Sequence, residues 1–394
     1  MKTISIVGGG PSALLLAAFL DETKYKVSIY EKNKTVGRKF LVAGDGGFNL
    51  THGEAIERMV ERYSPQSFLS NALLGFTNKD LIEWLKEIGI PTFIGSSKRV
   101  YPNKEIKPIE VLNKILKVIQ SKGVEIKCNQ TWTGWTADNA LTFETGSNVE
   151  SDYVVFALGG GSWKVTGSDG SWSSIFKKKG IVVENFQPSN CAYQLVWDES
   201  FINKFGGAPL KNIAISCGSK TQKGEVVITK FGLEGNAIYA LSPEIRNDFK
   251  TDNASTIQID LKPSLSVEGV LAKIKGSRFK KITDILKLDL KLSPVQLALV
   301  KKFVSREDFM DIEELAIQVK ALKLKLVGFE ALDKAISTVG GVSLSAVGNH
   351  FELKQIENQF CLGEMLNWDA PTGGYLLQGC FSMGVSLAKL LNEK

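Results

Sequence analysis

The stretch GRKFLVAGDGGFNLTH, residues 37–52, combines side chains that can carry a proton with backbone that can lie flat against a ligand. Imidazole titrates near neutral pH, and an amide and a hydroxyl beside it can hydrogen-bond a substrate. The candidates for catalysis are therefore His52, Asn49 and Thr51. A structural histidine bonded to backbone is the competing interpretation of His52. Three glycines, which have no side chain to hold a planar ring away, are expected to contact the ligand: Gly44, Gly46 and Gly47.

A glycine-rich turn near the N-terminus, GGGPSA, predicts a dinucleotide-binding unit. It follows an apolar strand and opens an apolar helix, with Ala13 as the third small residue of the G-x-G-x-x-G pattern. Glu31 closes the next strand, 23 residues after Gly8. A carboxylate there accepts the ribose hydroxyls and repels a 2′-phosphate, so the motif predicts FAD or NAD rather than NADP. The turn residues expected at the cofactor are Gly8, Gly10, Pro11, Ser12 and Ala13.

Glycine-rich loops recur at three distant places: 37–47, 159–161 and 373–374. A long dinucleotide lying across a sheet needs contacts from remote segments, which favours FAD. The sequence has no second strand–GxGxxG–helix unit followed by an acidic residue or an arginine that would bind the ribose or its 2′-phosphate. A nicotinamide donor is therefore expected to dock only transiently.

The elements that must position these groups read as a layered α/β fold. Apolar strands are predicted near 4–7, 27–31, 124–127 and 153–156, with helices near 13–20, 108–122 and 375–391. The helix at 13–20 is apolar on all sides, so it must be covered on several faces, as in a parallel sheet with helices on both sides. Residues 191–262 give short alternating runs without a long helix, which predicts an antiparallel β unit, and residues 264–325 look helical.

Composition narrows the class of protein further. The chain has 394 residues, 43% hydrophobic and 23% charged, which is typical of a folded protein of two or three units. Five cysteines without a C-x-x-C pair and two histidines predict no disulfide and no metal site. The apolar run after Gly8–Pro11 is short and ends in Asp21 and Glu22, so we expect no signal peptide, no membrane span and a cytoplasmic protein.

Basic charge is concentrated between Lys262 and Lys325. That segment has 14 lysines and arginines against 8 acids, an excess of 6 that equals the formal net charge of +6. Acidic residues interrupt it, so a solvated face is favoured over a nucleic-acid site. We expect a small-molecule substrate, and the sequence indicates no oligomeric state.

Together these pieces resemble the BaiN-like, or aminoacetone oxidase-like, family of FAD-dependent flavoproteins, in particular a branch with a GGxNLTH motif. The matching segments span nearly the whole chain and include GGGPSALLLA, GRKFLVAGDGGFNLTH, GIPTFIGSSKRVYP, ALGGGSWKVTGSDGSW, QPSNCAY, GLEGNAIYALS and GEMLNWDAPTGGYLLQGCFSMG. The resemblance implies a two-dinucleotide-binding-type fold with a Rossmann-like FAD domain built from both termini. It also implies an inserted antiparallel β-barrel and a small helical subdomain. The expected boundaries are 1–187 plus 335–394, 188–263 and 264–334.

The resemblance also carries site residues onto this chain. Further cofactor contacts are expected from Glu31, Lys32, Arg38, Lys39, Phe48, Asn49, Gly159, Gly160, Gly363, Glu364, Asp369, Thr372, Gly373, Gly374, Tyr375 and Leu376. Substrate contacts are expected from Arg99, Tyr101 and Phe48. The broad family shows an Arg-Cys pair where this chain has Gly47 and Phe48, which puts in doubt any mechanism that needs a thiol there. The helix after Gly373 and Gly374 is expected to direct its free N–H groups at the flavin and stabilise its anionic reduced form.

The sequence thus predicts an FAD-dependent oxidoreductase, in first place a reductase that passes a hydride through flavin N5 to a small molecule. Three alternatives stay open at this point. They are an oxidase that uses dioxygen, a flavin-dependent tRNA-modifying enzyme, and a flavin redox sensor without turnover.

Overall fold

The computed structural model describes residues 1–42 and 48–394, and its contacts divide the chain into two compact units. Unit 1 contains residues 1–189 and 332–394, and unit 2 contains residues 190–331. The chain thus leaves unit 1 once and returns to it. The three domain boundaries expected from the sequence stay a prediction.

A five-stranded parallel sheet is the centre of unit 1. Its strand order is β20-β10-β1-β2-β6. Strand β1 therefore pairs with β2, the next strand of the chain, on one side and with the distant β10 on the other. The strands are β1 (Lys2–Val7), β2 (Tyr25–Glu31), β6 (Glu125–Cys128), β10 (Tyr153–Phe156) and β20 (Gln359–Cys361). This arrangement confirms the predicted Rossmann-like sheet built from both termini.

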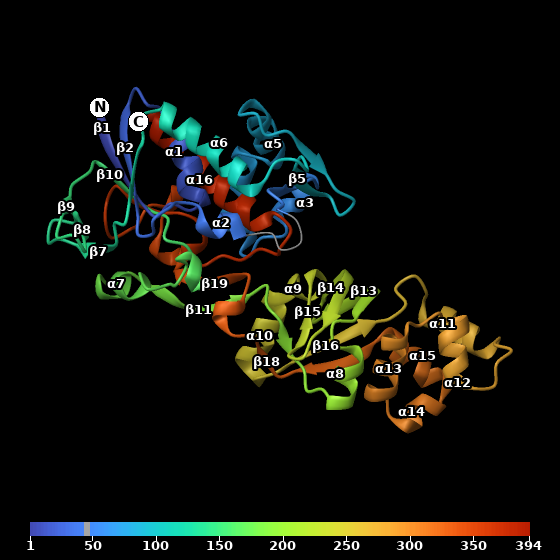
Figure 1. Ribbon diagram of the computed structural model, residues 1–394. Coiled ribbons are helices and arrows are strands. Elements are labelled where there is room, and N and C mark those ends of the chain that lie inside the picture. The colour runs from blue at the N-terminus through green and yellow to red at the C-terminus, as the bar shows by residue number, and fades with distance from the viewer. Residues whose placement is uncertain (43–47) are drawn as a thin grey trace. The chain divides into compact units, whose positions relative to one another are not determined.

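Three helices pack beside this sheet in Figure 1: α1 (Pro11–Phe19), α6 (Pro108–Ser121) and α16 (Tyr375–Glu393). Helix α1 is buried from Ser12 to Ala18, which confirms the prediction that an all-apolar helix is covered on every face. Its contact with α16 is close, because a Cβ added at Gly384 would lie 2.4 Å from the Ser12 carbonyl oxygen. The helix predicted from 375 to 391 is two residues longer than expected.

Smaller elements complete unit 1. A three-stranded sheet joins β3 (Thr51–His52), β5 (Arg99–Pro102) and β4 (Thr92–Ile94), and a second joins β7 (Trp132–Trp135), β8 (Leu141–Phe143) and β9 (Asn148–Val149). Strands β11 (Val183–Ser189) and β19 (Ser337–Val342) pair where the chain leaves unit 1 and returns. The short helices are α2 (Arg38–Val42), α3 (Ile56–Val60), α4 (Gln66–Gly75), α5 (Asn78–Glu87) and α7 (Ser173–Lys178).

Unit 2 is built on a seven-stranded antiparallel sheet of order β17-β16-β13-β14-β15-β12-β18. Its strands are β12 (Tyr193–Gln194), β13 (Pro209–Cys217), β14 (Lys220–Ile228), β15 (Gly232–Glu234), β16 (Ser255–Asp260), β17 (Leu322–Leu326) and β18 (Gly328–Phe329). The antiparallel prediction is confirmed, but the closed barrel is not, since β17 and β18 do not pair with each other in the described chain. They are instead consecutive pieces of one segment, joined by Val327, that supplies both edges of a curled sheet.

The helices of unit 2 follow the prediction only in part. The lysine-rich segment forms α11 (Val267–Lys275), α13 (Pro294–Phe303), α14 (Arg306–Met310) and α15 (Ile312–Lys320), as expected. The prediction of no long helix before residue 262 is wrong, because α10 (Ser242–Asp252) has 11 residues. Helix α10 was not predicted because its sequence has little apolar periodicity. The helix begins at Ser242 and Pro243 and buries only Ser242, Ile245 and Arg246.

Candidate functional site

A groove opens in unit 1 where β1 and β10 end, and it encloses about 1430 Å³, part of it open to solvent. In an open parallel sheet this is the place where a strand order reverses and ligands bind. The predicted residues that line it are Gly8, Gly10, Pro11, Ser12, Glu31, Lys32, Arg38, Lys39, Gly159, Gly363, Glu364 and Leu376. Residues from β1, α1, the end of β2, the end of β10 and α16 thus meet at one cavity.

The floor of the groove is the turn between β1 and α1. Gly8 has a φ of +100°, and a Cβ there would lie 2.3 Å from the Ala157 carbonyl oxygen, so only glycine fits. Gly10 is the N-cap of α1, and no side chain of the described residues caps the helix. Its first turn also lacks an acidic residue. The first N–H groups of α1 are therefore available to an anionic group in the groove.

Glu31 lies at the end of β2 beside this turn and is 8% exposed. Its Oε2 accepts a hydrogen bond from the Gly9 amide at 2.9 Å, and its Oε1 accepts one from the Asn33 amide at 2.8 Å. These two bonds fix the carboxylate at the edge of the groove. The next residue, Lys32, pairs with Asp169 at 2.8 Å across the same edge.

Lys39 and Glu364 form an ion pair in the groove wall. The Lys39 Nζ lies 2.9 Å from Glu364 Oε2 and 3.2 Å from the Ser162 hydroxyl. Glu364 also accepts a hydrogen bond from the Thr338 amide at 3.0 Å. Gly160, which does not line the groove, lies behind this pair, because a Cβ there would be 2.2 Å from Thr338 Oγ1. Arg38 is held differently, since it donates to the Val165 carbonyl at 2.7 Å.

Helix α16 brings its first turn to the groove. Leu376, Leu377 and Cys380 line the cavity, and burial raises the pKa of the Cys380 thiol to about 12. Gly374, the N-cap, has a φ of +101° and sits against β3, where a Cβ would lie 2.4 Å from the Thr51 carbonyl carbon. The helix start is thereby fixed against the segment that contains the catalytic candidates.

A polar network around the buried carboxylate of Glu54, which the sequence did not predict, holds the first residue of α16. The Tyr375 hydroxyl donates to Glu54 Oε1 at 2.7 Å, and the Tyr63 hydroxyl donates to the Tyr375 carbonyl at 2.7 Å. Arg62 donates to both oxygens of Glu54, each at 3.3 Å. Burial alone would raise the pKa of Glu54, but the hydrogen bonds from Arg62 and Tyr375 outweigh it and lower that pKa. Isolated Glu54 and Arg62 carry no sequence motif that could have revealed them.

The catalytic candidates of β3 are both engaged by the protein. The Thr51 hydroxyl is fully buried and donates to Gln378 at 2.7 Å. His52 stacks on Tyr375 with ring centroids 4.9 Å apart, accepts from the Glu54 amide at Nδ1 and lies 3.2 Å from the Ser97 carbonyl at Nε2. Burial lowers the pKa of His52, which favours this neutral, fully bonded ring. A catalytic role for either side chain stays a prediction that this geometry does not favour.

Asn49 differs from its neighbours. It is half-buried, and within the described chain no hydrogen bond engages its side-chain amide. The adjacent Phe48 packs edge-on against Phe40, a residue of the groove wall, with ring centroids 4.9 Å apart. A catalytic role for Asn49 stays a prediction. Gly44, Gly46 and Gly47, predicted to lie along the ring, fall outside the described residues.

The predicted substrate residues lie on the outer face of the small β3-β5-β4 sheet. Arg99 pairs in register with His52, and Tyr101 pairs with Phe93, on which its ring stacks at 5.5 Å. Arg99 approaches the start of α16, since a Cβ at Gly373 would lie 3.3 Å from its Nε. These residues and Phe48 do not line the groove itself, among those described.

Other cofactor predictions are also placed outside the groove lining of the described chain. They are Ala13, Gly160, Phe48, Asn49, Asp369, Thr372, Gly373, Gly374 and Tyr375. Asp369 is buried and accepts from the Ser189 hydroxyl at 2.8 Å, which gives it a structural use. Conversely, sequence reasoning missed groove residues such as Asn33, Trp132, Ser168 and Trp172. Asn33 and Trp132 lie in no motif, whereas Ser168 and Trp172 lie in ALGGGSWKVTGSDGSW, from which only Gly159 and Gly160 were predicted to contact the cofactor.

The groove fits a dinucleotide cofactor. The uncapped N-terminus of α1 suits a pyrophosphate, and the fixed carboxylate of Glu31 suits ribose hydroxyls. A family model described as the HI0933-like protein Rossmann domain matches residues 2–390. The chain belongs to this HI0933-like family. The resemblance inferred from the sequence motifs is thereby confirmed, and with it the predicted class, an FAD-dependent oxidoreductase.

Relatives of this HI0933-like protein include two enzymes aligned over all or nearly all of their length. A 3-dehydro-bile acid delta(4,6)-reductase of Clostridium scindens is 23% identical over 416 residues, which cover 100% of both chains. A ribosomal RNA dihydrouridine synthase of Haemophilus influenzae is 24% identical over 410 residues, covering 99% of this chain and 98% of that protein. A flavocytochrome c3 fumarate reductase shares the fold, with a TM-score of 0.50, 14% identity, and coverage of 98% of this chain and 78% of that one.

The helices of the protein were also assessed as membrane spans. Across residues 1–42 and 48–394, every helix is too short or too polar to cross a bilayer.

Proposed function

We propose that the protein is an FAD-dependent reductase that adds hydrogen across a carbon–carbon double bond conjugated to a carbonyl group in a small organic substrate. The observation that carries the proposal is the groove in which the free α1 N-terminus and Glu31 are arranged for a dinucleotide. The direction of the reaction is supported by the names of the two relatives, a delta(4,6)-reductase and a dihydrouridine synthase. Both names describe the addition of hydrogen to a double bond.

FAD supplies the hydride transfer when it is bound. The chain's own residues bind and orient the reactants. The first N–H groups of α1 would hold the pyrophosphate, Glu31 would accept the ribose hydroxyls, and the apolar side chains of Phe40, Leu376 and Leu377 in the lining would exclude water.

Asn49 has the role of orienting the substrate. An amide N–H donated to the substrate carbonyl would polarise the conjugated double bond toward reduction. Arg99 and Tyr101, on the face next to the start of α16, would contact the remainder of the substrate, with Arg99 suited to an anionic group. His52 has the supporting role of fixing Tyr375 by stacking.

The experiment is anaerobic stopped-flow reduction of the purified protein by NADH and by NADPH, followed through the flavin absorption band. Reduced protein is then mixed with three acceptors in turn: a 4-en-3-one steroid, uridine-containing RNA, and dioxygen. Fast reoxidation by the enone supports the proposal. A colourless protein that takes up no FAD would overturn it, and reoxidation by dioxygen alone, with peroxide release, would establish an oxidase instead.

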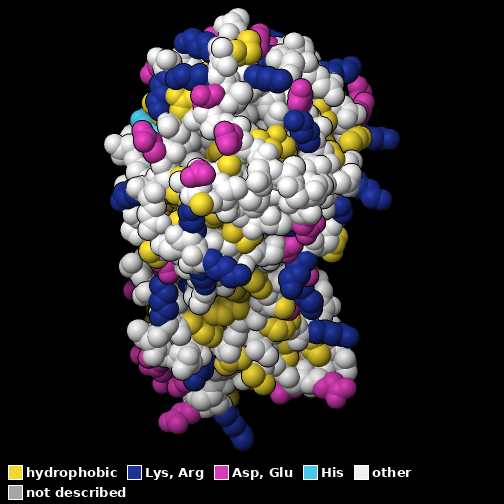
Figure 2. All heavy atoms as spheres, turned by 90° about the vertical axis from the view of Figure 1, so that its left-hand side faces the viewer, with side chains coloured by type: hydrophobic (Ala, Val, Ile, Leu, Met, Phe, Trp, Pro, Cys, Tyr) yellow, Lys and Arg dark blue, Asp and Glu magenta, His cyan; other side chains and the backbone are white. Residues whose placement is uncertain are grey.

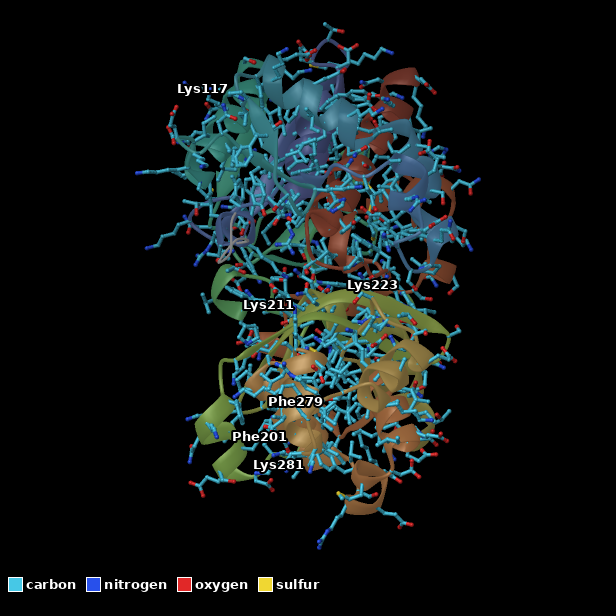
Figure 3. All side chains as sticks on the ribbon, turned by 90° about the vertical axis from the view of Figure 1, so that its right-hand side faces the viewer. Lys117, Phe201, Lys211, Lys223, Phe279 and Lys281 are labelled. Atoms are coloured by element: carbon cyan, nitrogen blue, oxygen red, sulfur yellow. The ribbon has the colours of Figure 1, made fainter. Side chains whose placement is uncertain are left out.

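Modification of a base in RNA is a second candidate function, favoured by the ribosomal RNA relative and by the segment 278–281. There the Arg278 guanidinium lies 5.0 Å from the centre of the Phe279 ring, a cation and an aromatic ring side by side as in single-strand binding sites. Figure 3 labels Phe279 and Lys281 on this segment of unit 2. Along residues 262–325, however, acidic residues interrupt the basic ones, which does not favour a continuous phosphate track. Figure 2 shows a different face, on which acidic and basic side chains are also interspersed.

Binding of a single-stranded, uridine-rich RNA at low salt separates the two candidates. Binding that weakens steeply as salt is raised would favour the RNA substrate. No binding at low salt would leave the small molecule.

A further inference from the structure

Two residues that line the groove each have a buried polar atom without a hydrogen-bond partner among the described residues. The Trp132 Nε1 and the Ser168 Oγ are both buried, and neither makes a hydrogen bond to any described residue. Each residue is only 6% exposed. Both line the groove, and their chain neighbours adjoin Glu31 and Lys32: the Gln130 amide donates to the Glu31 carbonyl, and a Cβ at Gly167 would lie 3.4 Å from Lys32 Cε.

Packing prevents Trp132 from turning its indole N–H elsewhere. Its ring contacts those of Trp135, Phe156 and Phe176, with centroids 4.7, 4.9 and 5.7 Å away. Such an interlocked aromatic cluster leaves no second rotamer without displacing neighbours. The indole N–H is therefore held in place rather than left unpaired by a mobile side chain.

Neighbouring tryptophans show that this cluster can satisfy an indole N–H. Trp135 donates to Gln359 Oε1 at 2.8 Å, and Trp172 donates to the Gly159 carbonyl at 3.0 Å. Ser168 lies against the same glycine, with its Oγ 3.4 Å from the place where a Cβ of Gly159 would be. Both Trp132 and Ser168 line the groove, as does the paired Trp172, whereas the paired Trp135 does not.

Buried polar groups are hydrogen-bonded in nearly all proteins, and an unpaired one destabilises the fold. A bound molecule that supplies an acceptor would remove this penalty. Tryptophan can only donate, so the atom facing Trp132 must be an oxygen or a ring nitrogen with a lone pair.

We infer that Trp132 and Ser168 are cofactor ligands that hydrogen-bond the adenosine half of the dinucleotide. The inference rests on the proposed function, because it takes the groove to bind FAD. Adenosine offers acceptor nitrogens on the base and oxygens on the ribose, and Glu31, the expected ribose contact, lines the same groove. These two side chains make the groove selective for FAD over FMN, which has no adenosine.

The test uses flavin-free protein, with FAD and FMN binding measured by quenching of flavin fluorescence, and unfolding of the flavin-free protein measured by heating. The variants are W132F and S168A, and W135F is the matched control from the same cluster. We expect W132F and S168A to raise the Kd for FAD about 5- to 10-fold, the loss of one hydrogen bond, and to leave the Kd for FMN unchanged.

The two tryptophan variants are expected to change the melting temperature of the flavin-free protein in opposite directions, which makes the test specific. Trp132→Phe removes an unpaired donor, so the flavin-free variant should melt at or above the wild-type temperature. W135F instead leaves Gln359 without its donor, so it should melt lower while binding FAD normally.

Two results would overturn the inference. One is wild-type FAD affinity in both W132F and S168A. The other is a weakening of FMN binding equal to that of FAD, which would indicate a general disturbance of the groove. If the wild-type protein takes up no FAD at all, it is the proposed function that fails.

Discussion

The Tyr375 hydroxyl donates a hydrogen bond to Glu54 Oε1 at 2.7 Å across 321 positions of the sequence. The bond joins the first residue of α16 to the segment that follows β3. Because Tyr63 holds the carbonyl of the same tyrosine, Tyr375 is fixed at both ends of the residue. The helix start that borders the groove is therefore positioned by a buried carboxylate and two tyrosines.

Replacing Glu54 should change the stability of the protein and its dependence on pH. The folded-state pKa of Glu54 lies below its ordinary value of 4.5, so the unfolded chain binds the proton more readily. Its contribution is present above pH 4.5 and is lost as the pH falls through the folded-state pKa. We expect E54Q to lower the free energy of unfolding at pH 7 by about 2 kcal/mol, with a smaller difference at pH 4. Urea unfolding at both pH values measures this.

Glu22 provides the control for that prediction, because its pKa is also lowered but its ion pair with Lys122 is exposed. E22Q should change stability by less than about 1 kcal/mol. Equal effects of E54Q and E22Q would contradict the role given to the network around Glu54.

Substitution of Gly374 tests the approach of α16 to β3. Alanine there would have to adopt a φ of +101° and place its Cβ 2.4 Å from Thr51 backbone. We expect G374A to lose about 3 kcal/mol of stability or to fail to fold. G123A is the control: Gly123 has a φ of +72° but open space around it, so about 1 kcal/mol is expected. Thermal unfolding of both variants measures this difference, and equal losses in G374A and G123A would contradict the close approach of α16 to β3.

Removal of the Glu31 carboxylate should weaken cofactor binding. E31A deletes the expected acceptor of the ribose hydroxyls and also the partner of the Gly9 amide in the turn. A loss of about 2 kcal/mol, or roughly 30-fold in the FAD dissociation constant, is expected. Titration of flavin-free protein measures it, with E125A on the neighbouring strand β6 as an exposed control. Unchanged affinity in E31A would place the ribose elsewhere.

Asn49 and His52 are expected to differ in kinetics. N49A removes the amide proposed to orient the substrate and should lower kcat/KM about 10-fold for a carbonyl-containing substrate. H52Q should affect mainly stability, because both ring nitrogens are bonded within the protein. The pH profile of kcat provides the check: loss of an inflexion in H52Q would show that the imidazole transfers a proton after all.

Most of the confirmed predictions came from local sequence patterns. The strand, glycine turn and apolar helix of residues 2–19 lie close together in sequence, so their periodicity and turn chemistry determine them without distant partners. The same holds for Glu31 at the end of β2 and for the apolar helix α16. The change to an antiparallel unit was likewise visible in the alternation of its strands.

Tertiary structure decided what depends on distant partners. The order of the strands in unit 2, with β17 and β18 of one segment at opposite edges of the sheet, is visible only in the structure. His52 is hydrogen-bonded to the backbone of Glu54 and Ser97, and Glu54 accepts a hydrogen bond from Tyr375. The spacing of these residues in the sequence does not predict these bonds. Trp132 faces the groove while Trp135, three residues on, finds Gln359. A sequence determines which groups are present and which local elements they form, whereas the pairing of buried polar atoms is determined only when the fold brings their partners within bonding distance.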